Sequence, residues 1–333
     1  MAPILSNQSS AVSSLNVLVT FPEVVAVVVT FNPNLTVLEQ ALKSYRSKCL
    51  VVIVDNGSDS ITLTNLRNKV SSTCKLIECG ANYGIAVALN RGIRAGLDWQ
   101  PEYYCLLDQD SVLEEGTLEC LVTISRQLAL QKGTLPVVAP VPVARNSGVP
   151  IGMYFKLSAG RHSQKVSQVE SIYTSGLVVP ASLAVEAPQM ESFFIDYVDT
   201  EWCYRVRTLY EAEIYVAHKA RIFHQVGDSE FRLGFVRRRP LLVHSPLRQY
   251  FQLRNAIWML RLPYIPVKAR LTIVLRCLAR VGILATSMAP RGIRLKYIAC
   301  AFFDGLRGRS GSHLFLPEQS RVKKFERDLA KIH

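Results

Sequence analysis

The sequence predicts an α/β fold in which strands and helices alternate along the first 110 residues. Apolar runs rich in Val, Ile, Leu and Tyr have the length of strands buried on both faces, and they occupy 24–30, 50–54 and 103–107. The segments between these runs carry helical signals, including apolar residues at Ile85, Ala88, Leu89 and Ile93. Strands separated in this way form parallel sheets with crossover helices, which predicts a doubly wound sheet.

The remaining elements follow from local signals. Asn32 and Pro33 form an N-cap and first helical position, and they predict a helix through Tyr45. A short helix is expected over 61–70, a weaker strand over 75–78 and a longer helix over 84–99. After residue 135 the pattern predicts short strands at 136–141, 151–157, 172–179 and 213–217. It also predicts one helix, near 199–210. The C-terminal part is expected to be helical, broken by Pro263, Pro266 and Pro290, over 245–262, 266–286 and 290–308.

Charge is distributed very unevenly along the chain. With 333 residues, 49% of them hydrophobic, the chain can bury a large core. Residues 1–220 contain 17 Lys and Arg against 20 Asp and Glu, whereas residues 221–333 contain 22 against 6. A basic region of this kind favours an anionic surface, either nucleic acid or a phospholipid leaflet. Because no nucleic-acid-binding motif accompanies the charge, we expect no nucleic-acid partner.

The cysteines and the N-terminus indicate a cytoplasmic protein. None of the eight cysteines forms a C-x-x-C pair, and no zinc pattern is present. Reduced thiols in a cytosolic protein fit this distribution best. Residues 1–14 lack a basic region followed by an apolar run, so a secretion signal is not expected.

Two carboxylates follow the last predicted strand of the first half. Asp108 and Asp110 are one residue apart, so both side chains can face one point and hold a hard divalent cation. Taken alone, such a pair is more often an acidic turn that closes a strand. Polar clusters at 30–32 and 55–58 also end strands, and ligands bind at this edge of a doubly wound sheet. No G-x-G-x-x-G follows the first strand and no P-loop motif occurs, which argues against a dinucleotide dehydrogenase and a P-loop NTPase.

An ordered series of motifs resembles the inverting glycosyltransferase family 2. The motifs are VVTFNP (28–33), VIVDNGS (52–58), NYGIA (82–86), LLDQDS (106–111), FIDYVDTEW (194–202), HQVG (224–227) and YFQLRN (250–255). Within the family, the DQDS and FIDYVD forms are most similar to bacterial rhamnosyltransferases of cell-surface polysaccharide synthesis. The resemblance implies a GT-A fold, a Rossmann-like mixed sheet flanked by helices. The motifs lie within a catalytic domain expected over 23–244, and the sequence pattern adds a flexible lead-in (1–22) and a basic helical C-terminal region (245–333).

The family binds a sugar nucleotide, and the resemblance implies which residues contact this donor. They are Thr30, Asn32, Asp55, Asn82, Gly84, Arg91, Asp108 and Gln109. Two of these positions also have a structural explanation. Gly84 can equally well serve only to start a helix, and for Arg91 a solvated helix face is the preferred interpretation.

The resemblance also implies Mg²⁺ or Mn²⁺ beside the donor diphosphate. Asp110 is expected as a direct ligand, with Asp108 nearer the ribose or a bound water. His224 matches a family histidine that reaches the metal or the diphosphate. Without the resemblance, His224 would be interpreted as a packed or surface residue.

Inversion requires one carboxylate that takes the proton of the attacking acceptor hydroxyl. The candidates are Asp196, Asp199 and Glu201, and Asp199 matches the family's base. The first position of the family's acidic pair is Val198 here, a departure that leaves its acidic partner open. Asp199 could instead cap the following helix. The acceptor is expected to contact Trp202, Asp196 and Arg254.

These expectations combine into one function with stated alternatives. The chain would transfer L-rhamnose from dTDP-L-rhamnose to a saccharide acceptor, free or lipid-linked, and a UDP-hexose is the alternative donor. Charges within 265–288 argue against a membrane span, so these helices either lie on an anionic inner leaflet or cap the catalytic domain. A non-catalytic membrane scaffold is disfavoured by the intact Asp108, Asp110 and Asp199. The oligomeric state stays open.

Overall fold

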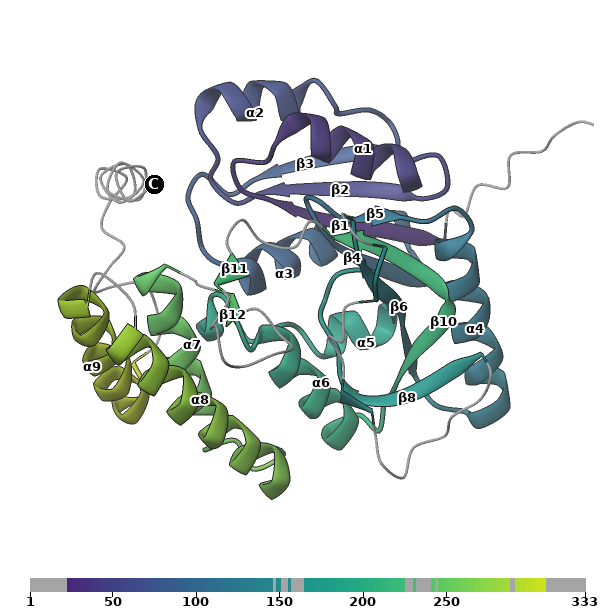
Figure 1. Cartoon of the computed structure of the whole chain (residues 1–333). Helices are drawn as coiled ribbons and strands as arrows, with labels where there is room; N and C mark the ends of the chain where they lie inside the picture. The colour runs from purple at the N-terminus through teal and green to yellow at the C-terminus, as the bar shows by residue number, and fades with distance from the viewer. Residues whose placement is uncertain are drawn as a thin grey trace, which may run out of the picture.

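A mixed β-sheet forms the centre of the molecule (Figure 1). The structure is a computed structural model that describes residues 23–145, 148–150, 155–156, 165–224, 230–231, 241–242, 245–287 and 291–309. The sheet runs in the order β3-β2-β1-β4-β9-β6-β10-β8-β7, and β5 pairs with β10. Its strands are β1 (Val24–Thr30), β2 (Leu50–Asp55), β3 (Cys74–Glu78), β4 (Tyr103–Asp108), β5 (Val112–Leu113), β6 (Pro136–Ala144), β7 (Phe155–Lys156), β8 (Val166–Ser171), β9 (Leu177–Pro180) and β10 (Glu213–His224). The predicted lead-in at 1–22 lies outside the described residues.

The first half of the sheet is parallel, as predicted. Strand β1 pairs in parallel with β2 and with β4, so that Thr30 lies opposite Asp55 and Val29 opposite Asp108. The ends of these three strands therefore meet at one edge. Beyond β4 the sheet becomes mixed, because β9 pairs antiparallel with both β4 and β6.

Helices cover both faces of the sheet (Figure 1). Along β1, Val24, Ala26 and Val28 face one layer, whereas the alternate residues face the other, as the period of two requires. The first layer contains α1 (Leu35–Tyr45), α2 (Ser60–Arg67) and α4 (Thr117–Lys132). The second contains α3 (Ile85–Gly96), α5 (Ala181–Glu186) and α6 (Val198–Leu209). Two short 3₁₀ helices are η1 (Leu97–Trp99) and η2 (Glu191–Phe193).

The predicted start of the first helix was two residues early. Helix α1 begins at Leu35, and the side chain of Asn34 accepts hydrogen bonds from the backbone N–H groups of Thr36 and Val37. Asn32 is in the left-handed region with φ of 43° and belongs to the loop. Asn34 is therefore the N-cap, since its side chain satisfies two N–H groups of the first turn.

A helix that the sequence pattern did not predict lies between residues 111 and 135. Helix α4 fills most of this segment, between Gly116 and Gly133, and both glycines have positive φ. Its buried residues include Leu118, Leu121 and Val122, which are spaced as one helical face. The strand expected over 172–179 is confirmed only from Leu177 onward, in β9, because residues 172–176 form the turn that follows β8.

Three helices in the C-terminal region match the predicted segments, within the described residues. They are α7 (Pro246–Met259), α8 (Val267–Ser287) and α9 (Arg291–Arg307), and a separate pair of short strands, β11 (Glu230–Phe231) and β12 (Leu241–Leu242), precedes them. Helices α7 and α8 share a hydrophobic cluster with Phe193 and Val198 of the sheet domain. The Tyr250 hydroxyl donates to the Asp304 carboxylate at 2.9 Å, which joins α7 to α9.

Candidate active site

Hydrogen bonds join the loops at the ends of β1, β2 and β4 into one edge. The backbone N–H of Phe31 donates to the Gln109 side chain at 2.9 Å, which links β1 to β4. Asn32 links β1 to β2, because its N–H donates to the Ser58 hydroxyl and its side chain accepts from the Asp59 N–H. The sequence therefore predicted correctly that these clusters meet.

Two predicted donor contacts are buried in this structure. Thr30 is fully buried, and its hydroxyl lies 3.4 Å from the Val54 carbonyl. Asp55 is 1% exposed, and its carboxylate accepts the backbone N–H groups of Gly57 and Ser58. In this conformation both side chains shape the edge, and Thr30 presents no exposed surface for the donor contact that the resemblance implies.

Asn82 connects the β2 loop to the loop after β3. Its side-chain oxygen accepts from the Asn56 amide at 3.1 Å and from the Gly84 N–H at 3.0 Å. The Asn56 side chain accepts in turn from the Tyr83 N–H. This reciprocal pair fixes the path of 82–84, and the half-buried Asn82 remains partly accessible at the edge.

Gly84 allows a close approach between distant parts of the chain. Its φ is 92°, and a Cβ added there would lie 2.5 Å from the Phe194 carbonyl oxygen. The next N–H, that of Ile85, donates to the same carbonyl at 2.7 Å. Gly84 therefore starts α3 and also packs against the segment that carries the predicted base.

Arg91 contacts an aromatic ring beside this loop. Its guanidinium lies 4.8 Å from the centroid of the Tyr83 ring, and 47% of Tyr83 is exposed. The sequence analysis did not single out Tyr83, although it lies within the NYGIA motif. A cation against an aromatic face stabilises the exposed ring at the edge.

Asp108, Gln109 and Asp110 are half-buried at the end of β4. The turn is closed by the Ser111 N–H, which donates to the Asp108 carbonyl, and by the Ser111 and Ser175 hydroxyls near the Asp108 N–H. These contacts fix the backbone of the turn that carries both carboxylates. Two hard oxygen ligands of this kind suit Mg²⁺ or Mn²⁺.

The end of β10 lies along the segment that carries Asp110. Strand β5 pairs antiparallel with β10, with Leu113 opposite Ile222 and Val112 opposite Phe223. This register brings the backbone of His224, the last residue of β10, toward Ser111. The His224 side chain lies outside what the structure describes, and no group of three or more His, Cys, Asp or Glu suited to a metal occurs among the described residues. The backbone placement and the two carboxylates fit the predicted ligand set.

A strained segment carries the predicted acidic residues. Phe194, Asp196 and Tyr197 all have φ between 61° and 63°, in the left-handed region that non-glycine residues rarely adopt. The Asn255 side-chain amide donates to three backbone carbonyls of this segment, those of residues 193, 195 and 196, each at 2.8 Å. Helix α7 thus holds the segment in this conformation.

Arg254 supports the same segment from inside the protein. It is fully buried, its guanidinium donates to the Ser192 and Phe193 carbonyls, and it packs 4.4 Å from the Trp258 ring centroid. Burial lowers the pKa of Arg254. The expectation that Arg254 binds the acceptor is wrong for this conformation, because the side chain faces the core.

Asp196 is paired with an arginine of α7. The Arg248 guanidinium forms a bidentate ion pair with the Asp196 carboxylate, at 3.0 and 3.1 Å. Partial burial opposes the charge of Arg248, but the Asp196 and Asp108 carboxylates raise its pKa overall. Arg248 therefore pairs with the acidic segment and also lies near enough to Asp108 to feel its charge. No motif in the sequence indicated this residue.

Asp199 differs from the other candidate bases. It lies in the first turn of α6, where its carboxylate accepts from the Thr200 N–H at 2.6 Å, and no Lys or Arg of the described residues forms an ion pair with it. Burial raises the pKa of Asp199 to about 6, and the negative charges of Asp196 and Asp108 add to the shift. The Thr200 hydrogen bonds oppose it. Asp199 is not the N-cap, which is Tyr197.

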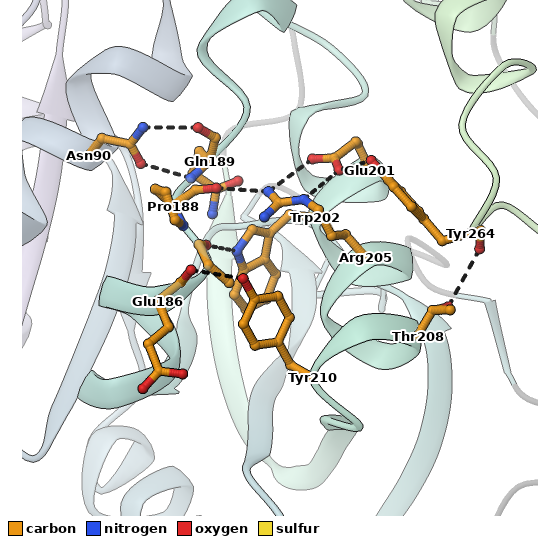
Figure 2. Close-up of polar contacts among 11 residues, drawn as sticks. Asn90, Glu186, Pro188, Gln189, Glu201, Trp202, Arg205, Thr208, Tyr210 and Tyr264 are labelled. Carbon is orange, nitrogen blue, oxygen red and sulfur yellow. Dashed lines mark hydrogen bonds and ion pairs between the residues drawn. The ribbon is translucent and has the colours of Figure 1, made fainter.

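Glu201 and Trp202 belong to a buried network on another side of α6 (Figure 2). Glu201 is fully buried and pairs with Arg205 at 2.7 Å and with the Tyr264 hydroxyl at 2.6 Å. The Trp202 indole N–H donates to the Ala187 carbonyl, and the ring is 1% exposed in the core. The prediction that Trp202 forms a wall of the acceptor site is therefore wrong, because its ring has no accessible surface.

Comparisons with known proteins indicate the family that the chain resembles. The family model for glycosyl transferase family 2 matches residues 25–129. The dTDP-rhamnosyl transferase RfbF of Shigella flexneri is 28% identical over 298 residues, which cover 86% of this chain and 96% of RfbF.

Solved structures extend the likeness to the fold. The S. aureus TarS 1–349 structure with UDP-GlcNAc has a TM-score of 0.53 at 15% identity, and the match covers 86% of this chain and 81% of that one. A GalNAc-T7 structure with UDP, GalNAc and Mn²⁺ has a TM-score of 0.50 at 13% identity, covering 83% of this chain and 59% of that one. Residues 25–129 thus match glycosyl transferase family 2, and the chain is a glycosyltransferase with the GT-A fold.

Proposed function

We propose that this glycosyltransferase transfers L-rhamnose from dTDP-L-rhamnose to a saccharide acceptor, with inversion at the anomeric carbon. The observation that carries the donor assignment is the 28% identity to dTDP-rhamnosyl transferase RfbF over nearly its whole length. A UDP-hexose is the second candidate donor, since TarS and GalNAc-T7 were solved with UDP compounds. That likeness is one of fold alone at 13–15% identity, so the dTDP donor is favoured.

The donor would lie along the edge formed by β1, β2 and β4. Asn32, Asn82 and Gln109 are accessible or half-buried there, and Tyr83 offers an exposed ring. Asp108 would contact the ribose or a bound water, and Asp110 the metal. Asp55 and Gly84 would act by shaping the loops that meet the nucleotide.

Asp108, Asp110 and His224 would hold Mg²⁺ or Mn²⁺, which supplies positive charge against the departing diphosphate. The negative charge of Asp108 reaches Asp199, since it contributes to the raised pKa of that carboxyl. A cation at Asp108 and Asp110 would offset this charge.

Asp199 would be the general base. Its carboxylate would accept the proton of the acceptor hydroxyl as that oxygen attacks the anomeric carbon from the face opposite the leaving diphosphate. A pKa of about 6 leaves the group ionised at neutral pH and more basic than an ordinary carboxylate, as proton abstraction requires. Asp196 would contribute to the acceptor site through the strained segment that it shares with Asp199.

A thermal-shift panel of dTDP-, UDP- and GDP-sugars, each with and without Mn²⁺, tests the donor and the metal together. We expect the largest rise in Tm with the dTDP compounds, and we expect that rise to require Mn²⁺. Asp110→Asn should abolish the Mn²⁺ dependence. Asp98→Asn is the matched control, since Asp98 is exposed and pairs only with Lys75 among the described contacts.

Other outcomes of the panel would contradict a specific part of the proposal. Stabilisation by UDP-sugars in place of dTDP-sugars would establish the alternative donor. A response that ignores Mn²⁺, or that survives Asp110→Asn, would contradict the metal assignment. No response to any nucleotide would contradict the proposed function as a whole.

A further inference from the structure

We infer that α8 and α9 form a surface that binds an anionic lipid bilayer. The inference concerns a surface away from the donor edge, and it holds whichever nucleotide sugar the enzyme uses. It starts from an unusual concentration of exposed apolar side chains. Of the 18 large hydrophobic residues exposed among the described residues, nine lie on these two helices, which together contain 38 residues.

On α8 these side chains form one stripe. Val267, Leu271, Leu275 and Leu278 are 58–79% exposed, and their spacing of four, four and three residues places them on a single helix face. The opposite face is buried, since Ile273 is 7% exposed and belongs to the cluster with Phe193. The stripe is therefore the side of α8 that the rest of the described protein leaves uncovered.

Helix α9 repeats the arrangement. Leu295, Phe302 and Leu306 are 46–50% exposed with a spacing of seven and four residues, and Phe303 beside them is 54% exposed. The buried face of α9 carries Ala301 and Asp304, which pack against α7. The two helices also contact each other, and they lie side by side in Figure 1. Helices α8 and α9, which are neighbours, thus each present an exposed apolar stripe.

Basic side chains flank both stripes. Lys268 and Arg276 are exposed on α8, and Lys296 and Arg307 are exposed on α9, where Arg307 lies 5.7 Å from the Phe303 ring centroid. Between residues 267 and 307 the sequence has eight Lys and Arg but one acidic residue, Asp304. That aspartate is 3% exposed and accepts from Tyr250, so it does not offset the positive surface.

This charge decides between two occupants of the apolar stripes. A second copy of the chain would bring two strongly positive faces together, and their repulsion opposes pairing. An anionic bilayer offers an apolar interior to the stripes and negative head groups to the flanking cations. The 21 residues of α8 span about 32 Å, long enough to lie along a membrane surface. Among the described helices, none has the length and apolarity to cross a bilayer.

Vesicle flotation of the full chain tests the inference. We expect binding to vesicles of phosphatidylcholine with phosphatidylglycerol, little binding to phosphatidylcholine alone, and release by added salt. Leu271→Gln with Leu275→Gln should weaken binding at least about tenfold, because two apolar anchors are lost while helix propensity is kept. The matched control is Ile61→Gln with Leu130→Gln, which are 76% and 89% exposed on α2 and α4, and it should bind as the wild type does.

A second pair of variants keeps the test decisive if the leucine variant does not fold. Lys268→Gln with Lys296→Gln removes two exposed charges and should weaken binding to anionic vesicles and reduce its salt dependence. Equal binding to neutral and anionic vesicles would overturn the inference, as would binding that neither pair alters. A dimer in sedimentation that dissociates on Leu271→Gln with Leu275→Gln would assign the surface to a second copy instead.

Discussion

At the scale of single residues, Asp199 combines a chemical advantage with a cost in stability. Its enclosure by protein, and the nearby negative charges of Asp196 and Asp108, disfavour the ionised carboxylate and raise its pKa to about 6. The same shift makes the carboxylate a stronger base. A carboxyl whose pKa is higher in the folded than in the unfolded state destabilises the fold once it ionises.

We predict that Asp199→Asn abolishes transfer while the nucleotide-dependent rise in Tm persists. The isosteric amide keeps the site but cannot take the proton, and such a loss is typically about 10²–10⁴-fold. In the wild type, activity should fall tenfold per pH unit below about pH 6, as Asp199 becomes protonated. The rate of transfer, or of slow donor hydrolysis by water, measures both the loss of activity in Asp199→Asn and the pH dependence of the wild type.

The stability of the same variant supplies an independent check. The destabilisation by Asp199 is absent below the carboxyl's ordinary pKa, grows up to about pH 6 and is constant above it. Asp199→Asn should therefore raise the free energy of unfolding at pH 7, by on the order of 3 kcal/mol, and leave it unchanged at pH 3. Asp98→Asn should show neither effect. Near-normal turnover by Asp199→Asn would transfer the role of base to another residue.

At the scale of elements, α7 determines the conformation of the acidic segment. The segment 194–197 contains three residues with positive φ, each of which costs about 1–2 kcal/mol. Three hydrogen bonds from Asn255 and two from Arg254 offset this strain. Positioning of the base thus depends on a helix that lies more than 50 residues further along the chain.

We predict that Asn255→Ala lowers kcat at least about tenfold, with a much smaller change in KM for the donor. Without the three bonds, the segment should relax away from its left-handed conformation and move Asp196 and Asp199. The lost bonds to buried carbonyls should also lower stability by about 2–4 kcal/mol. Steady-state kinetics and denaturant unfolding of the same preparation separate the two effects.

Asn90→Ala, on α3, is the matched control for Asn255→Ala. Asn90 is also buried, and its side chain bonds the backbone of Gln189 from α3 (Figure 2). It should lose comparable stability but keep a near-normal kcat, since Asn255 still holds 194–197. If both variants lost kcat equally, Asn255 would have a structural role only.

At the scale of the whole molecule, the strands and the edge of the sheet could be predicted from sequence. Runs such as 24–30 and 50–54 are apolar throughout because both faces of these strands are covered by helices, and a parallel order places their polar ends together. Burial within motifs could not be predicted. Trp202 and Arg254 lie in motifs beside functional residues, yet both face the core, because a motif does not state which side of a helix is covered. Arg248 and Asn255 act across chain separations of 52 and about 60 residues, which local patterns cannot show.

The donor edge and the acidic segment are joined at Gly84, and this junction gives the last prediction. Gly84 and Gly80 both have positive φ, so alanine at either position should cost about 1–2 kcal/mol in stability. Only at Gly84 would the added Cβ also meet Phe194, whereas nothing lies within 4 Å of a Cβ at Gly80. Gly84→Ala should therefore separate the loop at 82–84 from the acidic segment and lower both nucleotide affinity and transfer. Gly80→Ala should lose only stability, and calorimetry with steady-state kinetics distinguishes the two variants. Equal losses of transfer in the two variants would show that backbone strain alone determines the geometry of the site, and that the contact between Gly84 and Phe194 does not.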